Sequence, residues 1–342
     1  MNLYSWLQHG LFLLDAERSH EFALSTLPKL ERMKLLPLLT KKPVVAEKEV
    51  MGIRFPNSVG LAAGLDKNAD ALPALSALGF GFVEVGTVTP KPQPGNDKPR
   101  LFRLPEAQAI INRMGFNNKG IDHLVAQVKE AKVSIPVGIN IGKNAATPVD
   151  NAVDDYLIGL EKAYRLADYV TVNISSPNTQ GLRSLQHGNV LRDLLQPLKK
   201  KQAELQRLTK RYVPLVVKIA PDLIPDDVRE IAKVLLELDI DGVIATNTTL
   251  ARTAVAHLPH GHEAGGLSGA PLLNDSTQIV RLLAAECHDS LPIIAAGGIS
   301  SADNALQKIQ AGASLVQIYS GFIYQGPQLV HECASALSTM KV

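Results

Sequence analysis

Eight short apolar segments alternate with eight segments of helical periodicity from residue 59 to the end of the chain. Short, continuously apolar segments are typical of parallel strands that are covered on both faces. The apolar segments lie at 59–65, 82–88, 137–141, 169–174, 215–219, 242–246, 293–296 and 315–319, and the helical ones at 69–78, 121–131, 153–166, 190–208, 226–238, 276–286, 302–310 and 328–340. Eight such units predict an α/β fold, a (β/α)8 TIM barrel with its site at the carboxyl ends of the strands. A doubly wound open sheet is the alternative, and eight regular units favour closure.

Two connections are too long to be bare loops, and both leave from carboxyl ends of strands. Residues 89–118 contain a Pro/Gly-rich stretch and then 101–104 and 109–112, which we expect to pair as short strands. Residues 250–271 contain Gly261, Gly265, Gly266 and Gly269. We expect these connections to form a lid over the site. A small hairpin around Gly52 is predicted from 44–50 and 53–55.

Residues 1–42 differ from the barrel pattern, so the chain divides into an N-terminal extension, 1–42, and a catalytic domain, 43–342. Leu7, Leu11 and Leu14 recur at helical spacing, and a second helical pattern follows Asp15. Two short amphipathic helices with an apolar face and interspersed basic residues can lie in a membrane interface. They can equally pack on the main domain, and the pattern leaves both open.

Composition excludes several classes of function. The formal net charge is only +2 and the basic residues are dispersed, which argues against nucleic acid as a partner. Cys287 and Cys333 have no CxxC spacing, so neither a disulfide framework nor a zinc site is indicated and a reducing compartment is expected. The sequence contains neither a secretory signal pattern nor about 18 consecutive apolar residues. His257, His260 and His262 are interpreted as solvated loop residues, and no metal is predicted.

The stretch from Tyr169 to Arg183 is the most polar strand end. A β-branched run, 170–172, is followed within seven residues by Asn173, Ser175, Ser176, Asn178 and Thr179. Hydroxyls and amides without a strong acid suggest a hydroxyl base assisted by amide hydrogen bonds. A Ser/Asn-rich turn with no catalytic role is the alternative.

Other strand ends carry groups suited to an anionic, planar ligand. Lys67 follows the first strand, and Lys218 is isolated in an apolar strand, where it either forms a structural salt bridge or contacts an anionic ligand. Gly297 and Gly298 precede a helix, at the place where barrels commonly bind phosphate. A phosphate site combined with Lys218 near a flat ring suggests flavin mononucleotide, FMN.

Long strings in the chain resemble the dihydroorotate dehydrogenase family over nearly its whole length. They are GLAAGLDKN (60–68), EVGTVTPKPQPGNDKPRLFRL (84–104), INRMGFNN (111–118), VNISSPNTQGLR (172–183), KIAPDL (218–223), ATNTT (245–249), GGLSG (265–269), AAGGI (295–299) and IYSGF (318–322). The N-terminal amphipathic pair and Ser rather than Cys at position 176 resemble the membrane-associated, quinone-reducing class 2 form. Gln180 and Ala270 depart from the family's pattern, where proline and a basic residue are common, and they bear on loop stiffness.

The resemblance implies that FMN accepts a hydride from dihydroorotate, giving orotate for pyrimidine (UMP) synthesis. Ser176 would be the general base, and Phe116 would shield it. The implied substrate contacts are Lys67, Asn112, Arg113, Met114, Gly115, Phe116, Asn173, Asn178, Asn247 and Thr248. The implied cofactor contacts are Ala63, Gly64, Leu65, Asp66, Lys67, Thr87, Asn140, Asn173, Lys218, Thr246, Gly269, Gly298, Tyr319 and Ser320.

The resemblance also implies the partners of the protein. Electrons would pass to a membrane quinone, ubiquinone or menaquinone, with residues 1–42 on the membrane surface. The protein would be a monomer, bound peripherally at the cytoplasmic face of the inner membrane. Three other hypotheses compete: a soluble flavoenzyme that uses fumarate or nicotinamide, a cofactor-free lyase or isomerase acting on a sugar phosphate, and a structural membrane-binding protein.

Overall fold

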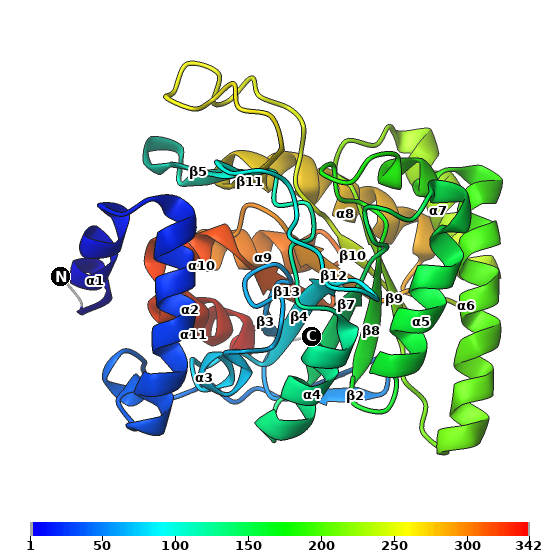
Figure 1. Cartoon of the computed structure of the whole chain (residues 1–342), viewed down its shortest axis with the longest axis horizontal. Helices are drawn as coiled ribbons and strands as arrows, with labels where there is room; N and C mark the ends of the chain where they lie inside the picture. Colours follow the sequence, from blue (N-terminus) through cyan, green and yellow to red (C-terminus); the bar gives the residue numbers. More distant parts are fainter. Residues whose placement is uncertain (1–2, 341–342) are drawn as a thin grey trace.

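The computed structural model describes residues 3–340, and the outermost residues of the predicted segments 1–42 and 43–342 lie outside this range. The chain begins with two helices, α1 (Leu3–Phe12) and α2 (Ala16–Arg32), which lie against one side of the main body (Figure 1). Asp15 separates them, because its carboxylate accepts hydrogen bonds from the backbone N–H groups of Glu17 and Arg18, both at 3.0 Å. The predicted helical pair is therefore present.

The predicted barrel is closed, which excludes the open sheet. Its eight parallel strands follow the order β10-β12-β13-β3-β4-β7-β8-β9. They are β3 (Val59–Leu61), β4 (Phe82–Val88), β7 (Val137–Ile141), β8 (Tyr169–Asn173), β9 (Leu215–Ile219), β10 (Gly242–Ala245), β12 (Ile293–Ala296) and β13 (Leu315–Ile318). Every residue of these strands is buried, as expected of strands covered by helices outside and by side chains inside.

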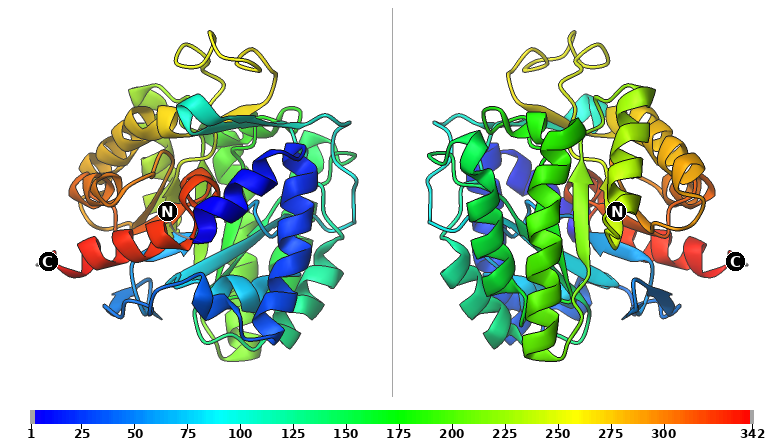
Figure 2. Two further views of the ribbon diagram at one scale, coloured as in Figure 1. Left: turned by 90° about the vertical axis from the view of Figure 1, so that its left-hand side faces the viewer. Right: turned by 90° about the vertical axis from the view of Figure 1, so that its right-hand side faces the viewer.

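A ring of helices surrounds the strands (Figure 2). They are α3 (Leu72–Ser76), α4 (Ile121–Ala131), α5 (Ala152–Ala163), α6 (Gly188–Thr209), α7 (Pro225–Glu237), α8 (Leu273–Cys287), α9 (Ala302–Gln310), α10 (Ser320–Gln325) and α11 (Pro327–Ser338). Short 3-10 turns lie at Leu36–Leu38, Pro105–Ala107, Val149–Asn151, Leu182–Gln186 and Ala270–Leu272. Within residues 3–340, no helix has both the length and the apolarity needed to cross a bilayer.

The first βα unit differs from its predicted bounds. The strand ends at Leu61 instead of residue 65, and the helix starts at Leu72 instead of residue 69. The cause is Asp66, a buried residue whose carboxylate accepts hydrogen bonds from the backbone N–H groups of Asn68, Asp70 and Ala71 at 2.8–3.3 Å. An aspartate that satisfies successive N–H groups in this way stabilises a turn at the expense of a strand or helix.

Two small sheets close the ends of the barrel. At the amino ends of the strands, β1 (Lys48–Val50) and β2 (Ile53–Phe55) form the predicted hairpin, and Phe55 packs edge-on against Phe82 with ring centroids 5.1 Å apart. At the carboxyl ends, β5 (Leu101–Leu104) pairs with β6 (Ala109–Asn112), as predicted. A third strand, β11 (Gly266–Gly269), pairs with β6 and was not predicted, because its Gly-rich sequence has no strand signal.

Candidate active site

A cavity of about 1040 Å3, partly open to solvent, lies at the carboxyl ends of the barrel strands. Most of the predicted site residues line it. They are Ala63, Gly64, Lys67, Thr87, Asn112, Met114, Gly115, Phe116, Asn173, Ser176, Asn178, Lys218, Thr246, Asn247, Thr248, Gly269, Gly298, Tyr319 and Ser320. The prediction that these segments converge is therefore confirmed, while the role of each residue stays a prediction.

Four predicted residues do not line this cavity. Leu65 lines a different cavity, described below, and Asp66 holds the turn after β3. Arg113 points toward the lid, where its guanidinium binds the Glu263 carboxylate at 2.7 Å and stacks over Phe102 at 4.7 Å. Asn140 lies one layer below the cavity, within a hydrogen-bond network.

Glu84 is the centre of that network. This buried carboxylate was not predicted, and it accepts hydrogen bonds from Asn140 Nδ2 (2.7 Å), Tyr169 Oη (2.9 Å), Gln317 Nε2 (2.8 Å) and Thr171 Oγ1 (3.2 Å). Asn140 Oδ1 in turn accepts bonds from Thr87 and Asn173, which line the cavity. Glu84 thus fixes the polar layer directly beneath the cavity.

Lys218 forms no direct salt bridge: in the described part of the chain no carboxylate oxygen lies within 4.0 Å of its Nζ. Burial lowers the pKa of Lys218, and the negative charge of Glu84 acts in the opposite direction. A buried ammonium with only a distant counter-charge is suited to stabilise negative charge on a ligand in the cavity. This geometry favours ligand contact over a structural salt bridge.

The glycines after β12 form a cradle against the start of α8. Gly298 has a φ of +80°, and a Cβ there would lie 2.3 Å from the Cα of Leu273, so a side chain would be strained and would clash. Ser276 donates to the Gly297 carbonyl at 3.0 Å and is itself bound by the buried Lys308 Nζ at 2.6 Å. Burial and the charge of Arg281 lower the pKa of Lys308 to about 7. A backbone turn at a helix start suits a phosphate.

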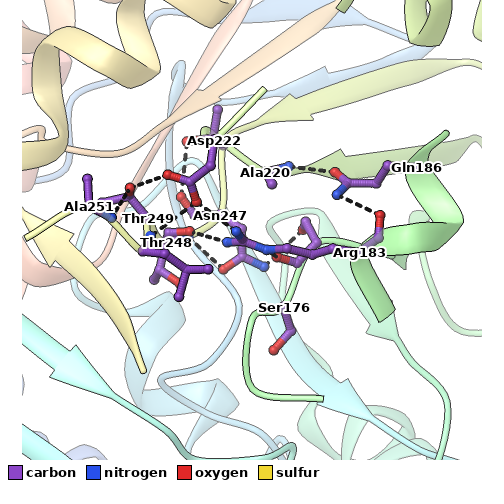
Figure 3. A network of polar contacts seen from close by, with 12 residues as sticks. Ser176, Arg183, Gln186, Ala220, Asp222, Asn247, Thr248, Thr249 and Ala251 are labelled. Atoms are coloured by element: carbon purple, nitrogen blue, oxygen red, sulfur yellow. Dashed lines mark hydrogen bonds and ion pairs between the residues drawn. The ribbon is translucent and has the colours of Figure 1, made fainter. Parts of the chain in front are cut away.

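Ser176 lies beside a network that joins three strand ends (Figure 3). Arg183 donates to the carbonyls of Ser175 (3.1 Å) and Thr248 (2.7 Å) and to the Asp222 carboxylate (2.7 Å). Ser176 is buried, and its Oγ accepts a hydrogen bond from the backbone N–H of Asn178 at 3.2 Å. Within residues 3–340, no carboxylate or imidazole bonds this hydroxyl. The hydrogen bonds of Arg183 therefore fix the backbone around Ser176, but Arg183 does not bond the Ser176 hydroxyl.

The insertion after β4 lines the same cavity as this serine. Phe116 is buried and has a φ of +54°, an uncommon conformation for a bulky residue. Strain of this kind concentrates at functional sites. Asn178 Nδ2 donates to the Asn112 carbonyl at 3.1 Å, which ties the serine loop to the insertion. The Thr248 Oγ1 atom is buried and has no partner in the described residues, so it is available to a ligand.

Sequence reasoning missed Gln317 and Ser268, which also line the cavity. Gln317 is 1% exposed, and its Oε1 has no partner in the described structure. It is a single polar residue in the apolar strand 315–318, the same signal that identified Lys218, so it could have been found. Ser268 accepts a hydrogen bond from Ser320 Oγ at 2.8 Å and lies on the unpredicted strand β11, where no signal was present.

A second, largely apolar cavity of about 1310 Å3 lies between the helical pair and the barrel. Leu7, Leu11 and Ala23 line it together with His20, whose pKa is lowered to about 3 by burial and by the charge of Lys67. α1 is attached to α10, because Tyr4 Oη donates to the Ile323 carbonyl at 2.8 Å. Tyr319 lines both cavities.

The remaining sequence candidates lie away from both cavities. His260 packs against Phe102, with ring centroids 5.4 Å apart. Cys287 and Cys333 are buried free thiols. Across residues 3–340, no three His, Cys, Asp or Glu side chains are grouped so that they could hold a metal ion.

The closed barrel, with a cavity rich in amides and hydroxyls at the carboxyl ends of its strands, defines a TIM-barrel protein whose cavity lies where enzymes of this fold have their active sites. A family model described as dihydroorotate dehydrogenase matches residues 45–340. The chain belongs to the dihydroorotate dehydrogenase family.

Relatives of nearly equal length support this assignment. The chain is 58% identical to the dihydroorotate dehydrogenase (quinone) of Cellvibrio japonicus, covering 98% of each chain, and 58% identical to that of Acinetobacter baylyi, covering 98% of this chain and 100% of the relative. A crystal structure of DHODH from Eimeria tenella in complex with ferulenol superposes with a TM-score of 0.86 at 39% identity, covering 94% of this chain and 90% of that one. The matches to the first two relatives span 337 residues, so they include most of the helical pair as well as the barrel.

Proposed function

We propose that this protein is a dihydroorotate dehydrogenase that oxidises dihydroorotate to orotate in pyrimidine biosynthesis and passes the electrons through a flavin to a membrane quinone. The observation that carries the proposal is the shared wall of the two cavities. One cavity is the more polar of the two and is lined by amides and hydroxyls, the other is almost wholly apolar, and Tyr319 lines both. Two such compartments suit an enzyme that takes electrons from a polar donor and passes them through one cofactor to an apolar acceptor.

FMN fits the polar cavity by two observations. The cradle at Gly298 has no room for a side chain and suits one terminal phosphate. The unpartnered Gln317 Oε1 and the Lys218 ammonium lie in the wall deeper in the barrel, where a ring or ribityl donor and a ring oxygen would satisfy them. When bound, FMN supplies the acceptor for the hydride of dihydroorotate. Residues that line the cavity and would hold it are Ala63, Gly64, Lys67, Thr87, Asn173, Lys218, Thr246, Gly269, Gly298, Tyr319 and Ser320.

Orotate carries a carboxylate and alternating C=O and N–H groups. These groups match the ammonium and the amides among the other side chains that line the cavity. Lys67 would bind the carboxylate, and Asn112, Asn173, Asn178 and Asn247 would pair with the ring. Thr248 Oγ1 would then gain the partner that it lacks. The amide-rich set therefore orients the substrate above the cofactor.

Ser176 is proposed as the general base that removes the C5 proton. Its Oγ accepts the Asn178 N–H, which stabilises negative charge on the oxygen. A serine hydroxyl is a weak base unaided, so its own proton must pass to a neighbouring hydroxyl or to water. Thr179, a buried residue three positions along the chain, is proposed to supply such a hydroxyl. Phe116, buried over the site, would exclude bulk water from the reaction.

Residues 1–42 are proposed to bind the membrane surface and to admit ubiquinone or menaquinone to the apolar cavity. Large apolar side chains of this segment are exposed, with Trp6 at 66%, Leu13 at 88% and Leu38 at 71%. An exposed apolar face of this kind suits an interfacial position. The free thiols fit a reducing compartment, which favours the cytoplasmic face of the inner membrane. The protein is proposed to act as a monomer.

The test is the visible spectrum of the purified protein under anaerobic conditions. The oxidised protein should show a flavin band, and dihydroorotate should bleach it. Addition of a short-chain quinone should restore the band. A flavin band that dihydroorotate does not bleach would contradict the substrate. A colourless protein that does not bind added FMN would contradict the cofactor and favour a lyase or isomerase of a sugar phosphate.

A further inference from the structure

A buried ion pair joins the N-terminal helices to the insertion that covers the polar cavity. Arg100 binds the carboxylate of Glu17 on α2 through Nη2 at 2.8 Å and through Nε at 3.1 and 3.2 Å. The two side chains are only 8% and 6% exposed. Fork-like pairing of this kind fixes the relative position of two segments more tightly than a single surface contact does.

Arg100 also organises the insertion itself. Its Nη1 donates to the backbone carbonyls of Pro94 at 2.7 Å and Asn96 at 2.6 Å. Asn96 in turn donates through its backbone N–H to the Met114 carbonyl at 3.1 Å and through Nδ2 to the Arg113 carbonyl at 2.9 Å. Met114 begins the segment 114–116 that lines the polar cavity. One guanidinium therefore connects α2 to the loop above the proposed substrate.

Glu17 also acts on Lys67 through its charge. Burial lowers the pKa of Lys67 to about 8, and Glu17 is the strongest of the opposing influences. The other charged or titratable groups that act on this lysine are Asp66 and Glu21, which favour its charged form, Arg100, which opposes it, and the half-buried His20. Removing the Glu17 charge would leave Lys67 less protonated at neutral pH.

We infer that Glu17 is a positioning residue for the dihydroorotate site. Through Arg100 it holds the insertion over the substrate, and by its charge it helps keep Lys67 in the charged form that binds the substrate carboxylate. This inference rests on the proposed function. It gives the helical pair a second role, in substrate binding, besides access for the quinone. Binding of the carboxylate substrate then depends on how α2 is seated on the barrel.

The chain offers a matched control. Lys98 in the same insertion contacts Glu21 on the same helix at 3.3 Å, and both side chains are exposed, at 57% and 60%. The same ammonium also lies 3.3 Å from Glu17, so each variant loses one contact with Lys98. Glu17→Gln and Glu21→Gln remove the same charge from the same helix, but only the first breaks the buried pair. The measurement is the Kd of orotate for the flavin-loaded full-length protein, followed by the change in flavin absorbance from pH 6 to pH 10.

We expect Glu17→Gln to raise the Kd of orotate about tenfold and to move the pH at which affinity declines to a lower value. Glu21→Gln should stay within about twofold of the unaltered protein, because exposed pairs contribute little. Arg100→Lys keeps the positive charge but loses the paired hydrogen bonds of the guanidinium to Glu17, so it should also raise the Kd of orotate. This variant tests the inference if Glu17→Gln does not fold.

Three results would overturn parts of the reasoning. Equal orotate affinity in Glu17→Gln and Glu21→Gln would show that the buried pair only fastens the helices. If Glu17→Gln raises the KM for quinone but leaves the Kd of orotate unchanged, the inference is also refuted. If the unaltered protein does not bind orotate, the proposed function fails instead, so the two failures are distinguishable.

Discussion

Replacing Glu84 by Gln should weaken flavin binding without adding or removing a heavy atom. Oε2 of Glu84 accepts three donors, and Oε1 accepts Asn140 Nδ2. A glutamine that turns its oxygen toward the three donors places its own NH2 against the Asn140 NH2. Asn140 must then flip, and its oxygen leaves the hydroxyl of Thr87 and the amide of Asn173. Both of these residues line the cavity.

The loss of one charge-assisted hydrogen bond is worth about 1.5–3 kcal/mol. With 1.4 kcal/mol for each factor of ten, that loss corresponds to a Kd for FMN raised about 10- to 150-fold. The assay is titration of the apoprotein with FMN, followed by quenching of flavin fluorescence. Tyr169→Phe is the control, because it removes one donor from the same carboxylate and leaves Asn140 in place. Equal Kd values for the two variants would refute the role of Glu84 through Asn140.

Four further predictions test the site. Ser176→Ala should bind orotate and flavin but reduce its flavin about 10²–10⁴-fold more slowly in stopped-flow absorbance, and an unchanged rate would exclude Ser176 as the base. Lys218→Met removes the buried ammonium and should slow flavin reduction by dihydroorotate about 10²–10³-fold; a variant with the normal rate would contradict its electrostatic role. Because Lys67 has a pKa of about 8 and orotate needs its charged form, the Kd of orotate should rise as the pH increases above about 8, by at most tenfold per pH unit, and a flat profile would exclude Lys67 as the carboxylate ligand. Ala23→Trp should fill the apolar cavity and lower reoxidation by quinone more than tenfold while dihydroorotate still bleaches the flavin, whereas unchanged reoxidation would place the acceptor elsewhere.

The fold was largely predictable because strand and helix periodicity is local. Each predicted barrel strand is present, and the main error concerned 62–71, where the side chain of Asp66 competes for backbone N–H groups. Strand β11 was missed for a different reason. Its residues 266–269 form a strand only because β6 provides a partner edge, so tertiary pairing overrides a Gly-rich sequence.

The sequence by itself determined the chemical inventory of the site. Ser176, Lys67 and most of the amides lie at or after the carboxyl ends of strands, and Lys218 lies near the carboxyl end of β9. Parallel strands bring these ends to one edge, so the convergence of the residues follows from topology. A single polar residue within an apolar strand also indicates a site residue, and both Gln317 and Lys218 show this pattern.

Only the tertiary structure decided which groups act on one another. Glu84 bonds four residues from three other strands, and Arg100 bonds Glu17, which is 83 residues away along the chain. It also decided that Tyr319 lines two cavities, one of them with many polar groups and the other almost wholly apolar, and that Arg113 faces away from the site. The physical reason is that burial and Coulomb interactions depend on distances through space, and these are set by the packing of segments that are remote in sequence.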